Sequence, residues 1–243
     1  MTTAGIIIIG NEILSGKVTD KNSPYLCREL RILGVEVKQI ITIPDVPEII
    51  GKTALEFSKR FTWVFTSGGI GPTHDDVTSE CMAEAFNCPI EINKDAKNKL
   101  EDYYRELGKI FNSARMRMAR IPKGAKLIEN SVSAAPGYSI GNVHVMAGIP
   151  KVFQAMVSSI LKTLKKGTPT LSRTLKFFIA ESEIATLLEK LSKDHPKLSI
   201  GSYPFDINNK FGVNIVVRGD SSELIDQFVK KLEAKIDEIN LPE

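Results

Sequence analysis

The chain has 243 residues, of which 42% are hydrophobic and 25% charged, so it is long and apolar enough to bury a core. Its net charge is only +3 and its three cysteines form no CxxC pair, so neither a basic nucleic-acid surface nor a disulfide framework or zinc site is expected. The longest aliphatic run, Ile6–Ile9, is far too short for a membrane span and follows no basic segment, so we expect a cytoplasmic protein without a membrane partner.

The first half of the chain alternates strand and helix signals. Strands are expected at residues 4–9, 35–43 and 62–66. A helix between the first two has Asn22 or Ser23 as its N-cap and ends at Gly34. A second helix is expected to be capped by Asp45, and its apolar face is Val46, Ile49, Ile50 and Phe57. Helical spacing resumes at Thr78.

The next hundred residues continue this alternation. A helical stretch is expected over residues 94–118, strands at 125–128 and 143–146, and a helix at 152–164. Strands and helices joined by short connections are typical of parallel βαβ units. The sequence therefore predicts an α/β fold of three layers, α/β/α, with a mostly parallel sheet.

A different pattern follows the turn-forming residues 165–170. We expect a strand at 175–180, a helix at 183–191, strands at 198–203 and 213–217 around the turn Asn208-Asn209-Lys210, and a helix at 224–236. This β-α-β-β-α order predicts a small α+β domain. The expected division is residues 1–166 and residues 171–243.

The candidate site follows the third strand, in the segment Ser67–Thr78. Glycines at positions 68, 69 and 71 allow backbone amides to approach an anion, and a helix begins at the end of the segment. Asp75 and Asp76 would repel a bare phosphate, but they suit a hard cation such as Mg²⁺ that bridges carboxylate and phosphate. The alternative is that the acids cap the helix and the glycines only turn the chain.

Other strand ends contribute polar residues to the same edge of the sheet, where ligands of open parallel sheets bind. Gly10-Asn11-Glu12 follows the first strand, Asp45 the second, and Gly148 the strand at 143–146. Glu12 either faces the site or is a solvated surface acid. His74 is an acid–base candidate or an exposed loop residue, and Ser131–Gly137 is a ligand-covering turn or a plain turn.

Several other functions lack their motifs. The chain has no P-loop, no GxGxxG after the first strand and no Ser-His-Asp order, and His144 and His195 are expected to be structural. Residues 171–243 contain no GxxG loop, so no nucleic-acid partner is expected. Five aromatic residues of this part are assigned to core and turn packing: Phe177, Phe178, Tyr203, Phe205 and Phe211.

Longer strings resemble a known family. They are GNEILSG at 10–16 with Asp20 and Asn22, SGGIGPTHDDVT at 67–78, SAAPG at 133–137 and GIPKVFQAM at 148–156. They resemble the molybdopterin-binding (MoaB/Mog-like) domain, in the branch of CinA proteins and of the N-terminal part of eukaryotic FAD synthase. ES at 181–182 and GSYP at 201–204 are similar to the small domain that follows in those proteins.

The resemblance implies a metal-dependent nucleotide pyrophosphatase that acts on ADP-ribose or FAD-like dinucleotides, with Mg, Mn or Co as the metal. Its alternative is molybdopterin binding or adenylyl transfer in molybdenum-cofactor biosynthesis, so the partner is a nucleotide or a pterin phosphate, and a homo-oligomer is expected. The implied catalytic residues are Asp76, Asp75 and Glu12, the first two of which also bind the metal. The expected phosphate ligands are Gly10, Asn11, Ser67, Gly68, Gly69, Gly71, Thr73, Thr78 and Gly148; further candidates are Asp45, Asn22, His74, Glu80, Ser133, Pro136 and Gly137.

Two segments depart from the family pattern. Ala147-Gly148 replaces the usual Pro-Gly, and Ser133-Ala134-Ala135 stands in the place of Gly-Thr-Ala. The chain also carries no deamidase or adenylyltransferase segment, so neither nicotinamide-nucleotide deamidation nor FAD synthesis is expected.

Overall fold

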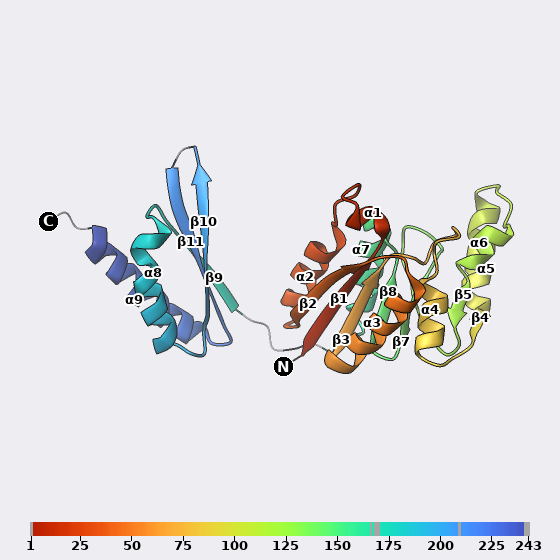
Figure 1. The fold of residues 1–243 in the computed structure, drawn as a ribbon, viewed down its shortest axis with the longest axis horizontal. Helices are drawn as coiled ribbons and strands as arrows, with labels where there is room; N and C mark the ends of the chain where they lie inside the picture. Colours follow the sequence, from red (N-terminus) through yellow and green to blue (C-terminus); the bar gives the residue numbers. More distant parts are fainter. Residues whose placement is uncertain (1, 166, 168–170, 209, 241–243) are drawn as a thin grey trace. The chain divides into compact units, whose positions relative to one another are not determined.

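A computed structural model describes residues 2–165, 167, 171–208 and 210–240. The chain forms two compact units, residues 1–167 and 168–243, and each is described by itself (Figure 1). The first unit contains β1 (Thr3–Ile9), α1 (Asn11–Leu14), α2 (Asn22–Ile32), β2 (Glu36–Ile43), α3 (Pro47–Arg60), β3 (Trp63–Ser67), α4 (Thr78–Ala85), β4 (Ile90–Ile92), α5 (Lys94–Glu106), α6 (Ser113–Arg117), β5 (Arg120–Pro122), β6 (Lys126–Ile128), β7 (Gly137–Ile140), β8 (Val143–Met146) and α7 (Pro150–Ile160). The second contains β9 (Leu171–Phe177), α8 (Glu181–Asp194), β10 (Ser199–Ile207), β11 (Lys210–Gly219) and α9 (Ser222–Asn240).

The first unit is built on a six-stranded sheet of order β2-β1-β3-β8-β7-β6. The strands β2, β1, β3 and β8 are parallel, and β7 runs antiparallel to both of its neighbours. Helices α2 and α7 cover one face, whereas α3 and α4 cover the other (Figure 1). The predicted α/β/α fold with a mostly parallel sheet is confirmed.

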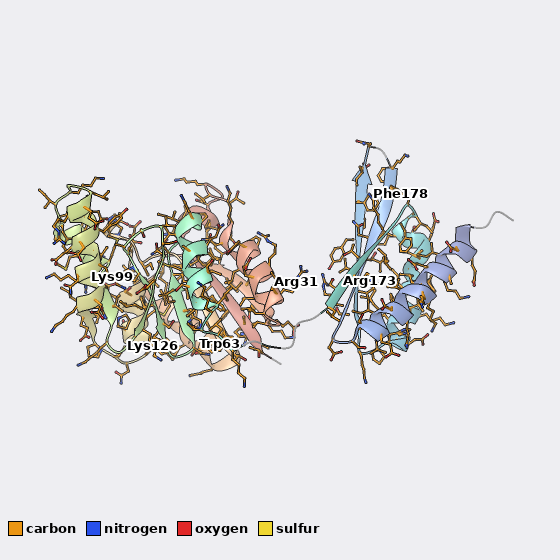
Figure 2. The ribbon with its side chains drawn as sticks, turned by 180° about the vertical axis from the view of Figure 1, so that it is seen from behind. Arg31, Trp63, Lys99, Lys126, Arg173 and Phe178 are labelled. Carbon is orange, nitrogen blue, oxygen red and sulfur yellow. The ribbon has the colours of Figure 1, made fainter. Side chains whose placement is uncertain are left out.

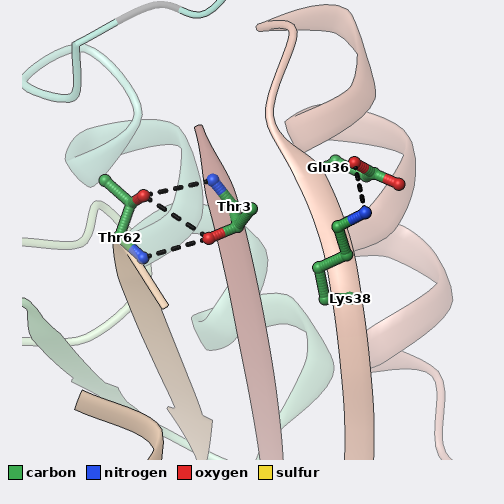
Figure 3. A network of polar contacts seen from close by, with 4 residues as sticks. All are labelled: Thr3, Glu36, Lys38 and Thr62. Atoms are coloured by element: carbon green, nitrogen blue, oxygen red, sulfur yellow. Dashed lines mark hydrogen bonds and ion pairs between the residues drawn. The ribbon is translucent and has the colours of Figure 1, made fainter. Parts of the chain in front are cut away.

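The central strand β1 shows why the sheet is buried on both faces. Ile7 and Ile9 pack toward α3 and α4, and Ile6 and Ile8 pack toward α2 and α7. A continuous aliphatic run is what a parallel strand between two helical layers requires. At the start of β1, Thr3 and Thr62 are joined by two hydrogen bonds (Figure 3). The backbone N–H of Thr62 donates to the hydroxyl of Thr3, and the backbone N–H of Thr3 donates to the hydroxyl of Thr62.

An ion pair lies on the neighbouring edge strand. Lys38 Nζ is 2.7 Å from Glu36 Oε2 on β2, and both side chains are about half exposed (Figure 3). Alternate residues of β2 point to solvent in this way, so this strand is only partly covered.

The starts of two helices differ from the expectation. Helix α2 begins at Asn22 after Lys21, and the orphan N–H groups of Asn22 and Ser23 donate to Asp20 Oδ1 at 2.8 and 3.1 Å. The expected N-cap at Asn22 or Ser23 is therefore wrong, because the carboxylate of Asp20, which lies outside the helix, accepts the first free N–H groups. The expected end at Gly34 is confirmed by its φ of 71°.

Helix α3 begins at Pro47 after Val46, and no side chain caps it. Asp45 is therefore not its cap. Two residues of its expected apolar face are largely at the surface, since Val46 is 37% and Ile49 39% exposed. Ile50 and Phe57 are buried as expected, with Ala54 between them.

The expected helix over residues 94–118 is two helices, α5 and α6. Gly108 has a φ of 64° and follows the end of α5, so the helical path is broken there. The short strands β4, β5 and β7 were not expected, because runs of three or four residues carry too little periodicity to predict.

The second unit has the predicted β-α-β-β-α order and a three-stranded antiparallel sheet, β10-β11-β9. Val213, Ile215 and Val217 of β11 pack against the apolar faces of α8 and α9. Asn209 of the expected turn lies outside the described residues. The expected core or turn packing is wrong for three aromatic residues of this unit, since Phe178 is 63%, Tyr203 48% and Phe211 70% exposed.

Two further findings concern membrane and thiols. In the part of the chain that the structure describes, no helix has both the length and the apolar character to cross a membrane.

Cys27, Cys81 and Cys88 are free thiols, as expected, although only Cys81 is fully buried. Burial raises the pKa of Cys81 to about 11, so this thiol is unreactive at neutral pH.

Candidate functional site

The order of the strands reverses between β1 and β3, and a ligand site is expected beyond the carboxyl ends of these two strands. From β1 the chain crosses to β2 on one side, and from β3 it continues to β8 on the other. Ligands of open α/β sheets bind where the strand order reverses in this way. The segments that begin at Gly10 and at Gly68 flank this point.

The residues Gly68–Gly71, here the glycine loop, have a backbone that admits no side chain at two positions. At Gly68 φ is +117°, and an added Cβ would lie 2.1 Å from the carbonyl oxygen of Ile9. At Gly69 φ is +69°, and an added Cβ would lie 2.1 Å from Thr78 Oγ1. Glycine is therefore required at both positions.

The glycine loop is anchored at both ends by hydrogen bonds. Gly68 N–H donates to the carbonyl of Met146 at 3.0 Å, and Thr78 N–H donates to the carbonyl of Gly69 at 3.0 Å. Thr78 Oγ1 donates to the carbonyl of Gly68 at 3.2 Å. Thr78 is fully buried, so its hydroxyl holds the loop against the start of α4.

Three consecutive N–H groups of the glycine loop are left over. Within the described residues, the backbone N–H groups of Gly69, Ile70 and Gly71 have no acceptor. They precede the N-terminus of α4, whose partial positive charge favours an anion. This is the chemistry of a phosphate site.

A buried asparagine ties three segments together beneath the loop. Asn22 Nδ2 donates to Ser67 Oγ at 2.8 Å and to the carbonyl of Gly148 at 2.7 Å. Asn22 and Ser67 are 5% and 2% exposed, so they position the loops that follow β3 and β8. Gly148 lies against Gly68, and an added Cβ there would make only ordinary contact, 3.5 Å from the Cα of Gly68.

The segment after β1 lies on the opposite side of the expected ligand site. Asn11 N–H donates to Asp45 Oδ2 at 2.8 Å, which joins the ends of β1 and β2. The exposed Glu12 turns its carboxylate back over the strand end, since an added Cβ at Gly10 would lie 2.5 Å from Glu12 Oε1.

The two neighbouring aspartates are in different environments. Asp76 is half-buried, and its Oδ2 accepts from the N–H of Thr73 at 2.8 Å and from the hydroxyl of Thr73 at 2.5 Å. Asp75 is exposed, and the pKa of its carboxyl lies below the ordinary value, chiefly because the Thr73 hydroxyl is near, then because of a backbone N–H. The Thr73 hydroxyl has one proton and lies near both carboxyls, so it donates to only one of them at a time. His74, which precedes Asp75, is exposed.

A small polar pocket lies beside Asp76. It has a volume of about 10 Å³, room for one water molecule, and Gly71, Asp76 and Pro136 contribute to its lining. Tyr138 and Arg117 also line it, and Tyr138 Oη and Arg117 Nε are buried without a hydrogen-bond partner in the described structure.

Both donors of this pocket are positioned by the fold. Arg117 Nη2 donates to the carbonyl of Asp76 at 3.3 Å. Burial raises the pKa of the Tyr138 phenol, and Ser79 lies near enough to oppose this without being placed for a hydrogen bond. Nothing in the sequence pattern singled out Arg117 or Tyr138, because α6 and β7 bring them to the site from distant segments.

The remaining candidates have structural partners. Glu80 Oε1 lies 2.8 Å from Arg120 Nη1, an ion pair that joins α4 to β5. Ser133 N–H donates to Asn130 Oδ1 at 2.6 Å within a turn. Gly137 begins β7, where an added Cβ would lie 2.5 Å from the carbonyl of Val145.

The carboxylates can be tested against the expected metal. Among residues 2–165, 167, 171–208 and 210–240 there is no group of three or more His, Cys, Asp or Glu side chains that could hold an ion. Mg²⁺ is usually bound through one or two carboxylates together with substrate phosphates, so it does not need such a group. The exposed, ionised Asp75 beside the free amides of the glycine loop fits a cation that arrives with a phosphate.

The fold and the site together define a class: an α/β/α unit with a phosphate-type loop at the switch point of its sheet, followed by a small α+β unit. Residues 5–166 match the family described as probable molybdopterin binding domain, and residues 169–242 match the FAD synthase, middle domain. The chain belongs to the probable molybdopterin binding domain family, and the resemblance to CinA-type, MoaB/Mog-like proteins is confirmed.

Relatives cover nearly the whole chain. A protein of Archaeoglobus fulgidus is 36% identical over 229 residues, which are 94% of this chain and 95% of that protein. Protein PH0439 of Pyrococcus horikoshii is 30% identical over 248 residues, 97% of this chain and 96% of that protein. A further match is the crystal structure of the protein CinA with unknown function from Thermoplasma acidophilum, which is 30% identical with a TM-score of 0.62. The match covers 67% of this chain and 98% of the Thermoplasma chain.

Proposed function

We propose that the protein is a metal-dependent nucleotide pyrophosphatase that acts on ADP-ribose or FAD-like dinucleotides at the glycine loop. The observation that carries this proposal is the run of three N–H groups without acceptors, at Gly69, Ile70 and Gly71, beside the N-terminus of α4. Such a run binds phosphate oxygens and stabilises the charge that develops on them during hydrolysis.

The acids supply what the amides lack. Asp75, whose pKa is lowered, and Asp76 would hold a Mg, Mn or Co ion, and Glu12 at the end of β1 is a third carboxylate. When bound, a divalent ion polarises a diphosphate and lowers the pKa of water. Asp76 is held rigidly by Thr73, so it is oriented before the substrate arrives.

Arg117 and Tyr138 extend the phosphate site on the side of α4. Both residues line the one-water pocket next to Asp76, and each has a buried, unpartnered N–H or O–H group. A water or a phosphate oxygen there would satisfy both groups. We therefore assign this pocket to a water molecule or oxygen of the reacting diphosphate.

A second candidate function rests on the family description. The first unit matches a probable molybdopterin binding domain, and the free amides of the glycine loop would accept a pterin phosphate as readily as a nucleotide phosphate. The match of the second unit to the FAD synthase, middle domain favours a dinucleotide ligand instead.

The test is product release from ADP-ribose and from FAD by the full chain, with Mg²⁺, Mn²⁺ or Co²⁺ supplied in turn. We expect metal-dependent formation of AMP, lost at least about 100-fold in Asp76→Asn. Asp95→Asn, an exposed acid on α5, is the matched control and should retain full turnover.

Either of two outcomes would reject the pyrophosphatase. One is full turnover by Asp76→Asn. The other is no turnover by the folded wild-type chain with any of the three metals, in which case the affinity for molybdopterin becomes the deciding measurement.

A further inference from the structure

The second unit has a sheet face that none of its described helices covers. Val213, Ile215 and Val217 point toward α8 and α9, so the residues between them point to the opposite, open face. The register places on this open face Ser172, Thr174 and Lys176 of β9, Ser199, Gly201, Tyr203, Phe205 and Ile207 of β10, and Lys210, Gly212, Asn214, Val216 and Arg218 of β11.

Two aromatic rings of this face lie over glycines. An added Cβ at Gly212 would meet Phe205 Cζ at 2.4 Å, and one at Gly201 would meet Tyr203 Cε2 at 2.9 Å. Each ring therefore rests on the bare backbone of a glycine. Phe178, which follows β9, packs edge-on against Phe205 with centroids 5.5 Å apart and is itself 63% exposed (Figure 2).

The same face carries positive charge and no negative charge. Its charged side chains are Lys176, Lys210 and Arg218, and none of them forms an ion pair within the described residues. Lys176 Nζ lies 4.6 Å from the ring centre of Phe205 and 5.0 Å from that of Phe178. By contrast, Arg173 of the same strand, which is paired with Asp226 at 2.7 Å, points toward the helices (Figure 2).

We propose that this aromatic face, formed by Lys176, Phe178, Tyr203, Phe205, Lys210 and Arg218, binds single-stranded nucleic acid. Bases stack on the rings, and phosphates pair with the cations of the face, Lys176, Lys210 and Arg218. Tyr203 and Phe205 are two residues apart on one strand, about 7 Å, so that successive bases can each reach a ring. Sheet aromatics are used in this way to stack unpaired bases, and the stacking tolerates any sequence.

The charge of the face favours nucleic acid over a second copy of the chain as its partner. Two copies joined face to face would bring Lys176 and Arg218 of one against the same cations of the other, which is unfavourable. A polyanion with planar groups matches both features of the face. The expectation of no nucleic-acid partner rested on the missing GxxG loop and the small net charge, and neither describes this face.

The test measures the binding of a labelled 12-nucleotide poly-dT and of oligo-U by fluorescence anisotropy, using the full chain. With three phosphates neutralised, we expect the affinity to fall about 18-fold between 50 and 200 mM salt. Tyr203→Ala should weaken binding at least about fivefold, and Lys176→Gln should weaken it while reducing the salt dependence.

Two variants of the same unit serve as controls. Phe211→Ala removes an aromatic residue that is 70% exposed but lies in the register of Val213, and Lys230→Gln removes an exposed cation of α9. Both should bind as the wild type does.

Several results would overturn the proposal. They are no binding at 50 mM salt, binding that Tyr203→Ala leaves intact, or AMP competing as well per nucleotide as the oligomer does. A dimer in sedimentation that Tyr203→Ala converts to a monomer would instead assign the face to a contact between copies.

Discussion

The glycine loop of the first unit and the aromatic face of the second unit present ligands with different parts of the chain. The loop offers backbone N–H groups, held by a conformation that Gly68 and Gly69 alone can adopt. The face offers side chains, and its glycines, Gly201 and Gly212, leave room for the rings of Tyr203 and Phe205. A glycine is required where an added Cβ would strike backbone, as at Gly68. It can be replaced where the Cβ would meet only a ring that can move, as at Gly201.

Gly68→Ala should have the largest effect. Its Cβ would strike the carbonyl of Ile9 at 2.1 Å in a left-handed backbone conformation, so strain and clash together should lower the free energy of unfolding by about 4 kcal/mol. Urea unfolding measures this.

Gly16→Ala is the control for backbone strain alone. Gly16 has a φ of +72° with nothing within 4 Å of its added Cβ, so about 1 kcal/mol is expected. Equal losses in the two variants would show that the packing of the glycine loop on β1 is not tight.

Acid should weaken the first unit through His144. This side chain is 3% exposed, and burial lowers its pKa from 6.5 to about 4. Between these values the unfolded chain binds the additional proton, so the free energy of unfolding falls as the pH drops from 6.5 to 4, by about 3 kcal/mol at most.

The single tryptophan, Trp63, makes this measurable in the first unit. Its ring centre lies 5.5 Å from that of His144, and no other tryptophan reports on the second unit. Urea titrations followed by tryptophan fluorescence at pH 7, 5.5 and 4 should show the loss, and His144→Gln should reduce it. An unchanged pH dependence in that variant would contradict the assignment.

Gly201→Ala should have the smallest effect on stability, less than about 1 kcal/mol. Its added Cβ meets only the ring of Tyr203, at 2.9 Å, and that side chain can swing away. The displaced ring should nevertheless reduce oligonucleotide binding. A loss of stability as large as that of Gly68→Ala would show that the two glycines do not differ as described.

Sequence patterns predicted the layers of the first unit well because its strands are aliphatic on both faces, as β1 shows. They placed the glycine loop for a related reason, since backbone clashes dictate the residue type. Tertiary contacts decided the rest. Asp45 binds the N–H of Asn11 across the sheet rather than its own helix, and Gly108 divides one helical period into two helices.

The aromatic face shows the limit more sharply. Alternation along β10 gives two sets of residues, and the sequence does not say which set meets the helices. Phe205 and Tyr203 look like core residues until the register pairs Ser202 with the buried Ile215. In the same way, the pocket of Arg117 and Tyr138 exists only because α6 and β7 meet beside Asp76.

The central claim is that the free N–H groups of the glycine loop bind phosphate. The most direct measurement is a titration of the ¹⁵N-labelled full chain with pyrophosphate and Mg²⁺, followed through the backbone amide resonances. We expect the largest shifts at Gly69, Ile70 and Gly71, with little change at Gly16 and Gly141. Saturable binding whose shifts lie elsewhere, with the glycine loop unmoved, would contradict this claim.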